Sequence, residues 1–262
     1  MGDFEAVRLE IGGGIATVTL SQPQRLNATT PRVIGEIMAA VDMSLQEGAR
    51  VLVLTGEGRA FCSGAGLKDE VGASALTGDL GLVLEEHYNP LFLRLAELPI
   101  PIVSVVQGPA AGAGCSLALA ADFVIASHAA YFLMAFVNIG LVPDMGATWL
   151  LPRLVGIPRA TEMLMLGEKL SAEKAEAWGL IYRATTPAAL SETAAALTNR
   201  LARGPTVAYG LLRTALRAGL HQPLAASLAL ERANQRRAGD TADCAEGVQA
   251  FLNKRPAVFT GA

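Results

Sequence analysis

Two segments near the middle of the chain carry residue types that could do acid–base chemistry beside a carbonyl group. GPAAGAG (108–114) follows the apolar run IPIVSVV, so we expect a strand, a tight turn and a helix that begins at residues 112–114. Free backbone N–H groups at such a helix start can hold a negatively charged oxygen. The segment GLVPDMGATW adds one carboxylate, Asp144, in apolar surroundings, where it could transfer a proton.

Both segments also have a purely structural interpretation. GPAAGAG fits a close contact between strand and helix equally well, and Asp144 taken alone fits better as the cap of a helix in GATWLLPRLVG. GPAAGAG is not part of a GxxxxGK[ST] phosphate-binding loop, and Leu117 replaces the third glycine of a dinucleotide fingerprint. Residues 114–118 lack the second glycine of a serine-hydrolase nucleophile elbow. The choice between packing and chemistry stays open on these residues alone.

Strands and helices alternate in the part of the chain that must position these groups. VRLEIGGGIATVTLS predicts a hairpin, and Pro31 opens an amphipathic helix. A further helix is expected near residues 80–97, after the glycine-rich loop GEGRAFCSGAGLKDE. Apolar strands are expected at 51–56, 102–106, 122–127 and 129–134. This order predicts an α/β fold with crossover helices.

Composition excludes several functional classes. The 262 residues suit one large domain, or one domain with an appendage, and the net charge of −3 comes without a basic tract for nucleic acid or anionic membrane. Neither a signal peptide nor a membrane-spanning run is expected. Three separated cysteines and three separated histidines predict a cytoplasmic protein without a metal site.

The last third of the chain changes to Ala- and Leu-rich helices. They are expected at 187–203, 205–219, 222–238 and 241–254. A cap on the core and an oligomerisation layer both fit them, and the hydrophobic share of 52% suits the second use. We therefore divide the chain into a core (1–195) and a C-terminal helical oligomerisation region (196–262).

Six segments in order resemble the crotonase superfamily, also called the enoyl-CoA hydratase/isomerase superfamily. They are QPQRLNA (22–28), GEGRAFCSGAGLK (56–68), the run 101–127, IGLVPDMGATWLLPRLVG (139–156), LGEKLSAEKAEAWGLI (166–181) and FLNKRPAVFTG (251–261). The resemblance implies an α/β crotonase (ClpP-like) spiral of ββα units with C-terminal trimerisation helices. It also implies an acyl-CoA thioester substrate, whose oxygen is held by the backbone N–H groups of Ala65 and Ala113, beside Gly112.

Three departures from the family pattern bear on the reaction. Ser116 and Phe136 occupy the two positions at which the hydratases carry catalytic glutamates, and Gly66 replaces the usual loop aspartate, which puts the rigidity of that loop in question. Asp144 lies where ring-epoxyphenylacetyl-CoA isomerases and related enoyl-CoA isomerases carry their acid/base. Chlorobenzoyl-CoA dehalogenases place a nucleophilic aspartate there.

These observations predict an acyl-CoA isomerase that moves a proton through an enolate, with Asp144 as acid and base. An enoyl-CoA hydratase of the same family and a catalytically silent acyl-CoA-binding homologue are the alternatives. Substrate-binding residues are expected at Arg25, Lys68, Gly112, Phe136, Trp149, Phe251 and Lys254, and Phe136, Val142, Met145 and Trp149 are expected to raise the pKa of Asp144. No cofactor is expected beyond the CoA of the substrate, in a homotrimer or dimer of trimers that serves phenylacetate or fatty acid metabolism.

Overall fold

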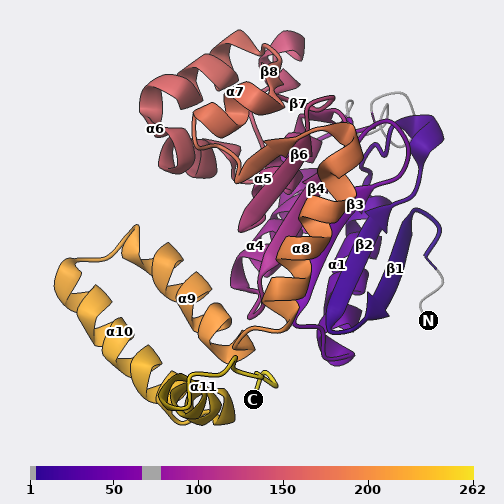
Figure 1. The fold of residues 1–262 in the computed structure, drawn as a ribbon. Helices are drawn as coiled ribbons and strands as arrows, with labels where there is room; N and C mark the ends of the chain where they lie inside the picture. Colours follow the sequence, from indigo (N-terminus) through magenta and orange to yellow (C-terminus); the bar gives the residue numbers. More distant parts are fainter. Residues whose placement is uncertain (1–3, 67–77) are drawn as a thin grey trace.

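The centre of the fold is a sheet that is parallel except for its first pair of strands. The computed structural model describes residues 4–66 and 78–262. Within these ranges the strand order is β1-β2-β3-β4-β6-β9, and only the β1–β2 pair is antiparallel (Figure 1). The strands are β1 (Val7–Gly12), β2 (Ile15–Leu20), β3 (Val51–Gly56), β4 (Ile102–Val106), β6 (Phe123–Ser127) and β9 (Arg183–Thr185). The hairpin and the strands expected at 51–56, 102–106 and 122–127 are confirmed.

The hairpin turn explains the glycines at the start of the chain. Gly13 and Gly14 have φ of +60° and +78°, values that a two-residue type I′ turn requires at both central positions. Gly12 pairs directly with Ile15 across this turn.

Helices cover both faces of the parallel strands. Helix α1 (Pro31–Gln46) begins at the Thr30 cap, whose side chain accepts a hydrogen bond from the Val33 N–H, and its buried side chains pack with Leu52. Val51, the next residue along β3, points to the opposite face and packs with Leu201 of α8 (Leu190–Ala202). The apolar sequence of β3 therefore reflects burial from two sides.

A second, smaller sheet lies beside the central one and carries the segment GPAAGAG. Its order is β5 (Ala110–Ala111), β7 (Tyr131–Leu133) and β8 (Leu170–Ser171), so the strand expected at 129–134 is present as β7. The accompanying helices are α5 (Ala113–Leu119), the 3-10 helix η3 (Ala135–Ile139), α6 (Ala147–Leu166) and α7 (Ala172–Ala177). Gly156 interrupts α6 with φ +75°, between Pro152 and Pro158.

The helix expected at 80–97 is present, but a wider turn interrupts it. Helix α3 (Leu80–Val83) leads into a π-helical turn, η2 (Leu84–Tyr88), and then into α4 (Asn89–Glu97). The Asn89 N–H donates to the Leu84 carbonyl, five residues back. Pro90 follows, which lacks an N–H and whose ring would crowd a regular α-helical turn.

The C-terminal helices form an arm that extends from the central sheet. Beyond α8 lie α9 (Thr206–Gly219), α10 (Leu224–Gly239) and α11 (Ala242–Leu252), close to the helices expected from the sequence (Figure 1). The proposed division at residue 195 falls inside α8, which packs on the sheet. The division itself stays a prediction. The remaining short 3-10 helices are η1 (Pro23–Arg25) and η4 (Pro187–Ala189).

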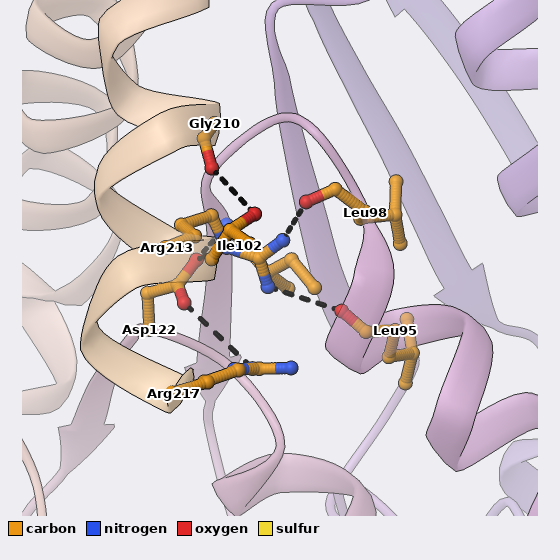
Figure 2. A network of polar contacts seen from close by, with 8 residues as sticks. Leu95, Leu98, Ile102, Asp122, Gly210, Arg213 and Arg217 are labelled. Atoms are coloured by element: carbon orange, nitrogen blue, oxygen red, sulfur yellow. Dashed lines mark hydrogen bonds and ion pairs between the residues drawn. The ribbon is translucent and has the colours of Figure 1, made fainter. Parts of the chain in front are cut away.

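One buried arginine attaches the arm to the core. Arg213 of α9 pairs with Asp122 at 2.6 Å and donates to the carbonyls of Leu98 and Leu95, at the end of α4 (Figure 2). The same Asp122 carboxylate accepts the Ile102 N–H at 2.8 Å, where β4 begins. The middle of α9 is thereby fixed to the end of the central sheet at which β4 begins.

None of the described helices has the length and apolar character that crossing a bilayer requires.

Candidate active site

Two glycine-containing segments run side by side at the centre of the candidate site. The Cys62 N–H donates to the Pro109 carbonyl at 3.2 Å, and the Cys62 carbonyl accepts the Ala111 N–H at 2.9 Å. This pairing is a parallel bridge between Cys62 and Ala110. The loop after β3 and the turn before α5 are therefore held in a fixed register.

Glycines allow the backbones of these two segments to approach closely. A Cβ built on Gly64 would lie 2.8 Å from the Ala111 carbonyl oxygen and 3.5 Å from the Ala113 nitrogen. A Cβ on Gly114 would lie 2.5 Å from the Cys62 carbonyl oxygen. Gly112 has φ +51° and ψ −129°, a conformation that other residues rarely adopt. GPAAGAG is thus a close-packing turn, as the structural interpretation held, and it packs against Cys62 and Gly64 of the loop after β3.

The Ala65 N–H is directed away from Thr29, the residue that pairs with Ala65 in an isolated parallel bridge. The Thr29 N–H donates to the Gly64 carbonyl at 2.8 Å, and the Thr29 carbonyl accepts the Gly66 N–H at 2.9 Å. Because Thr29 bonds to Gly64 and Gly66, the N–H and carbonyl of Ala65, which lies between them, point away from Thr29. Among the described residues, neither the Ala65 N–H nor the Ala113 N–H donates a hydrogen bond. The structure therefore brings two available donors together on neighbouring segments.

Asp144 lies next to the first turn of α5. The Ser116 hydroxyl donates to the Asp144 backbone carbonyl at 3.3 Å, and Ser116 lies one helical turn beyond Ala113. The cap of α6 is Gly146, and the Asp144 side chain does not cap this helix. The helix-cap interpretation of Asp144 is therefore wrong. Met145 and Gly146, both with positive φ, turn the chain between Asp144 and α6.

Burial controls the electrostatics of the Asp144 carboxylate. Among the described residues its Oδ1 atom is buried and accepts no hydrogen bond. Loss of solvation raises the pKa of Asp144 to about 6, because burial penalises the charged form. An aspartate with this pKa is mostly ionised at neutral pH, yet it can still carry a proton during a reaction.

The apolar residues expected around Asp144 lie in different environments. Phe136, on η3, is buried, and its ring lies 3.8 Å from the position of a Cβ built on Gly112. Met145 is also buried. Val142, by contrast, is 81% exposed, so the expectation that its side chain desolvates Asp144 is wrong. Trp149 is half-buried in the first turn of α6, where it stacks on His221 with ring centroids 5.3 Å apart. Whether Trp149 contacts a substrate stays a prediction.

The residues expected near the CoA nucleotide are spread over the chain. Arg25 ends η1 and is exposed, near the loop that contains Ala65, because the Leu26 carbonyl accepts the Ser63 N–H at 3.0 Å. Lys68 lies outside the described residues. Phe251 and Lys254 are exposed, in and just after α11. Figure 1 shows that α11 is well separated from α5. Within one chain, the structure does not bring these last two to the site.

Sequence reasoning missed Tyr88 and Thr29, which form a buried contact at the site. The Tyr88 hydroxyl donates to the Thr29 side-chain oxygen at 3.3 Å, and the two residues are 59 positions apart. Burial, and to a smaller extent the negative charge of Asp144, raise the pKa of Tyr88. Pro90, two residues beyond Tyr88, was the available signal that the helix is irregular here.

Comparison with known proteins gives a consistent family assignment. The family model "Enoyl-CoA hydratase/isomerase" matches residues 10–262. A "Probable enoyl-CoA hydratase" of Rhodobacter capsulatus is 46% identical over 259 residues, which cover 98% of this chain and 99% of the relative. The chain belongs to the enoyl-CoA hydratase/isomerase family.

Other members of the enoyl-CoA hydratase/isomerase family agree in sequence and in fold. The 1,2-epoxyphenylacetyl-CoA isomerase of Escherichia coli is 43% identical over 260 residues, with 98% of this chain and 99% of the relative covered. A solved enoyl-CoA hydratase/isomerase from Cupriavidus metallidurans CH34 superposes with a TM-score of 0.92 at 30% identity, covering 100% of this chain and 98% of the other. The expected crotonase fold, with its C-terminal helical region, is confirmed.

Proposed function

We propose that this family member is an acyl-CoA isomerase in which Asp144 moves a proton through an enolate intermediate. The observation that supports it best is the position of Asp144, a half-buried residue whose carboxylate has a buried Oδ1 and a raised pKa, and which Ser116 links to the turn that presents Ala113. Ala65 supplies the second available N–H on the neighbouring segment. One carboxylate and two donors are the groups that an enolate-forming proton shift needs.

The proposed reaction uses the carboxylate twice. Asp144 removes a proton from a carbon activated by the thioester, and the electron pair of the broken C–H bond moves into the thioester carbonyl. The Ala65 and Ala113 N–H groups stabilise the resulting oxyanion, and one donor of this kind is worth about 3 kcal/mol of barrier. Protonated Asp144 then returns the proton to another carbon as the carbonyl re-forms. Such a proton shift is redox-neutral and uses no cofactor besides the CoA of the substrate.

An unsaturated acyl chain and a ring epoxide are both substrates of the proposed class. The second is favoured by the 43% identity to a 1,2-epoxyphenylacetyl-CoA isomerase and by Phe136 beside Gly112. In this proposal Phe136 and Trp149 contact the acyl group, while Arg25, Lys68, Phe251 and Lys254 contact the CoA nucleotide. Phe251 and Lys254 would come from a neighbouring subunit.

Hydration of an enoyl-CoA is the second candidate function, favoured by the 46% identity to a "Probable enoyl-CoA hydratase". The family's two-glutamate hydration chemistry has no counterpart at Ser116 and Phe136, neither of which transfers protons at neutral pH. A hydratase of this chain would therefore have to activate water with Asp144 alone.

One set of assays distinguishes the candidates. Purified protein is incubated with a β,γ-enoyl-CoA, an α,β-enoyl-CoA and an epoxyphenylacetyl-CoA. Liquid chromatography separates isomers, which share the mass of their substrate, and mass spectrometry identifies hydrated products by the mass of the added water. We expect isomers that contain no added water. The rate of their formation should fall at least a hundredfold in Asp144→Asn and stay unchanged in the exposed control Glu97→Gln. Hydrated products, or turnover that survives in Asp144→Asn, would overturn the mechanism. Thioester binding without any turnover would identify a silent homologue.

We also propose that the arm mediates assembly into a homotrimer or a dimer of trimers. Its helices expose large apolar side chains that a monomer would leave in water; they are Leu212, Leu216, Leu220, Leu224 and Leu228. Sedimentation of the wild type is expected to give a trimer or hexamer mass, and Leu216→Glu with Leu224→Glu should reduce it. A monomer of the wild type at micromolar concentration would contradict this assembly.

A further inference from the structure

The backbone of Thr29 forms hydrogen bonds with the two residues that flank Ala65 in the sequence. Its N–H and carbonyl bond to the residues immediately before and after Ala65, at 2.8 and 2.9 Å. Any rotation of the Thr29 peptide groups would therefore tilt the Ala65 peptide and redirect its N–H. Ala65 itself is exposed, so its own side chain contributes little packing that could fix this direction.

The Thr29 side chain is fixed by a residue from a different part of the chain. Its hydroxyl oxygen accepts the Tyr88 hydroxyl at 3.3 Å, and the two residues are 1% and 4% exposed. Tyr88 ends the π-helical turn just before α4, whose Leu91 and Leu95 are fully buried. The Tyr88 hydroxyl thus transmits the rigidity of α4 to Thr29.

The phenol of Tyr88 stays protonated in this environment. Burial, together with the charge of nearby Asp144, raises its pKa above the ordinary value of a tyrosine. Cys62, the other titratable group that acts on it, has a buried thiol with a pKa of about 12. Tyr88 is therefore a permanent hydrogen-bond donor next to Thr29, and it does not compete with Asp144 as a base. A π-turn at this point fits a functional role, because such turns are frequent at functional sites.

We propose that Tyr88 and Thr29 are positioning residues that set the direction of the Ala65 N–H toward the enolate oxygen. The inference rests on the proposed function, because it assigns the Ala65 N–H to the oxyanion. Neither side chain touches the reacting atoms. Their effect passes from the Tyr88 hydroxyl to the Thr29 side chain, and through the Thr29 peptide groups to Ala65.

The test measures enolate binding directly. Acetoacetyl-CoA forms an enolate with its own ultraviolet absorption, so the ionised fraction of the bound ligand reports the strength of the donors. Butyryl-CoA, which does not ionise, reports binding of the thioester alone. Tyr88→Phe and Thr29→Val remove one hydroxyl each at nearly constant volume, and Thr29→Ser keeps the hydroxyl as the matched control.

In Tyr88→Phe and Thr29→Val, we expect the affinity for the acetoacetyl-CoA enolate, divided by the affinity for butyryl-CoA, to fall about tenfold. The kcat should fall by a similar factor, and the affinity for butyryl-CoA itself should not change. Thr29→Ser should keep the wild-type ratio. An unchanged ratio in Thr29→Val, even with a lower Tm, would make the pair purely structural and overturn the proposal. If Tyr88→Phe does not fold, the comparison of Thr29→Val with Thr29→Ser decides. Absence of isomerase turnover in the wild type would refute the proposed function, yet enolate binding would still report on the pair.

Discussion

Replacing Asp144 with asparagine should make the protein more stable as well as inactive, and the gain should depend on pH. The pKa of Asp144 rises from 3.8 to about 6 on folding, because burial disfavours the charged form. Between these two values the folded state binds more protons than the unfolded state, so stability falls as pH rises through this window. Well above pH 6 the ionised carboxylate lowers the free energy of unfolding by about 3 kcal/mol, which corresponds to the shift of about two pKa units.

The magnitude at two pH values follows from the same two pKa values. At pH 7.5 nearly the whole cost of about 3 kcal/mol is present, whereas at pH 4.5 partial protonation leaves about 1 kcal/mol. Asp144→Asn has no charge to bury, so its advantage over the wild type should be about 2 kcal/mol larger at pH 7.5 than at pH 4.5.

Urea unfolding of both proteins at the two pH values measures this difference, provided that protein concentration is held constant. Glu97→Gln, on the exposed side of α4, is the control for the loss of one negative charge. An advantage of Asp144→Asn that is equal at both pH values, or larger at pH 4.5, would refute the argument that burial raises the pKa of this carboxylate.

Three further outcomes follow from the structure. The kcat/KM of the isomerase should rise with pH through about 6, the pKa of Asp144, and be about tenfold higher at pH 7 than at pH 5; a flat profile would exclude Asp144 as the base. Gly114→Ala should lower the free energy of unfolding by about 1–3 kcal/mol, because its Cβ would overlap Cys62 in the loop after β3, whereas Gly35→Ala in the open part of α1 should raise it by about 0.5–1 kcal/mol. Arg213→Met should lower the free energy of unfolding in urea by about 1–3 kcal/mol, because the Leu95 and Leu98 carbonyls lose their buried donor while Asp122 keeps the more distant Arg217 as an ion-pair partner.

The sequence predicted those features of the site that depend on local chemistry. Glycine at 64, 112 and 114 indicated backbone that approaches closely, and each lies where a Cβ would be crowded or the backbone is left-handed. Asp144 was ambiguous, because an aspartate after proline, taken alone, fits a helix cap better than an acid. Only the structure separates the two, since it places Gly146 at the cap and Asp144 beside Ser116.

The contact between Tyr88 and Thr29 could not be predicted, because it depends on how α4 packs against the loop before α1. A tyrosine in an amphipathic helix is most simply interpreted as core, and here it is indeed buried. The partner of its hydroxyl lies 59 residues away. Likewise, Arg213 lies on a helix whose sequence suggests a solvated cation, and only the fold brings Asp122 and two carbonyls to it.

The two available donors of the site belong to the main chain, and this has an evolutionary consequence. A main-chain N–H is present in every residue except proline, so point mutations at Ala65 or Ala113 to any residue other than proline cannot delete a donor as they delete a catalytic side chain. What mutation can change freely is the set of side chains around the donors, at positions such as 116, 136 and 144. A scaffold of this kind can lose one reaction and gain another while it keeps the same means of stabilising the intermediate.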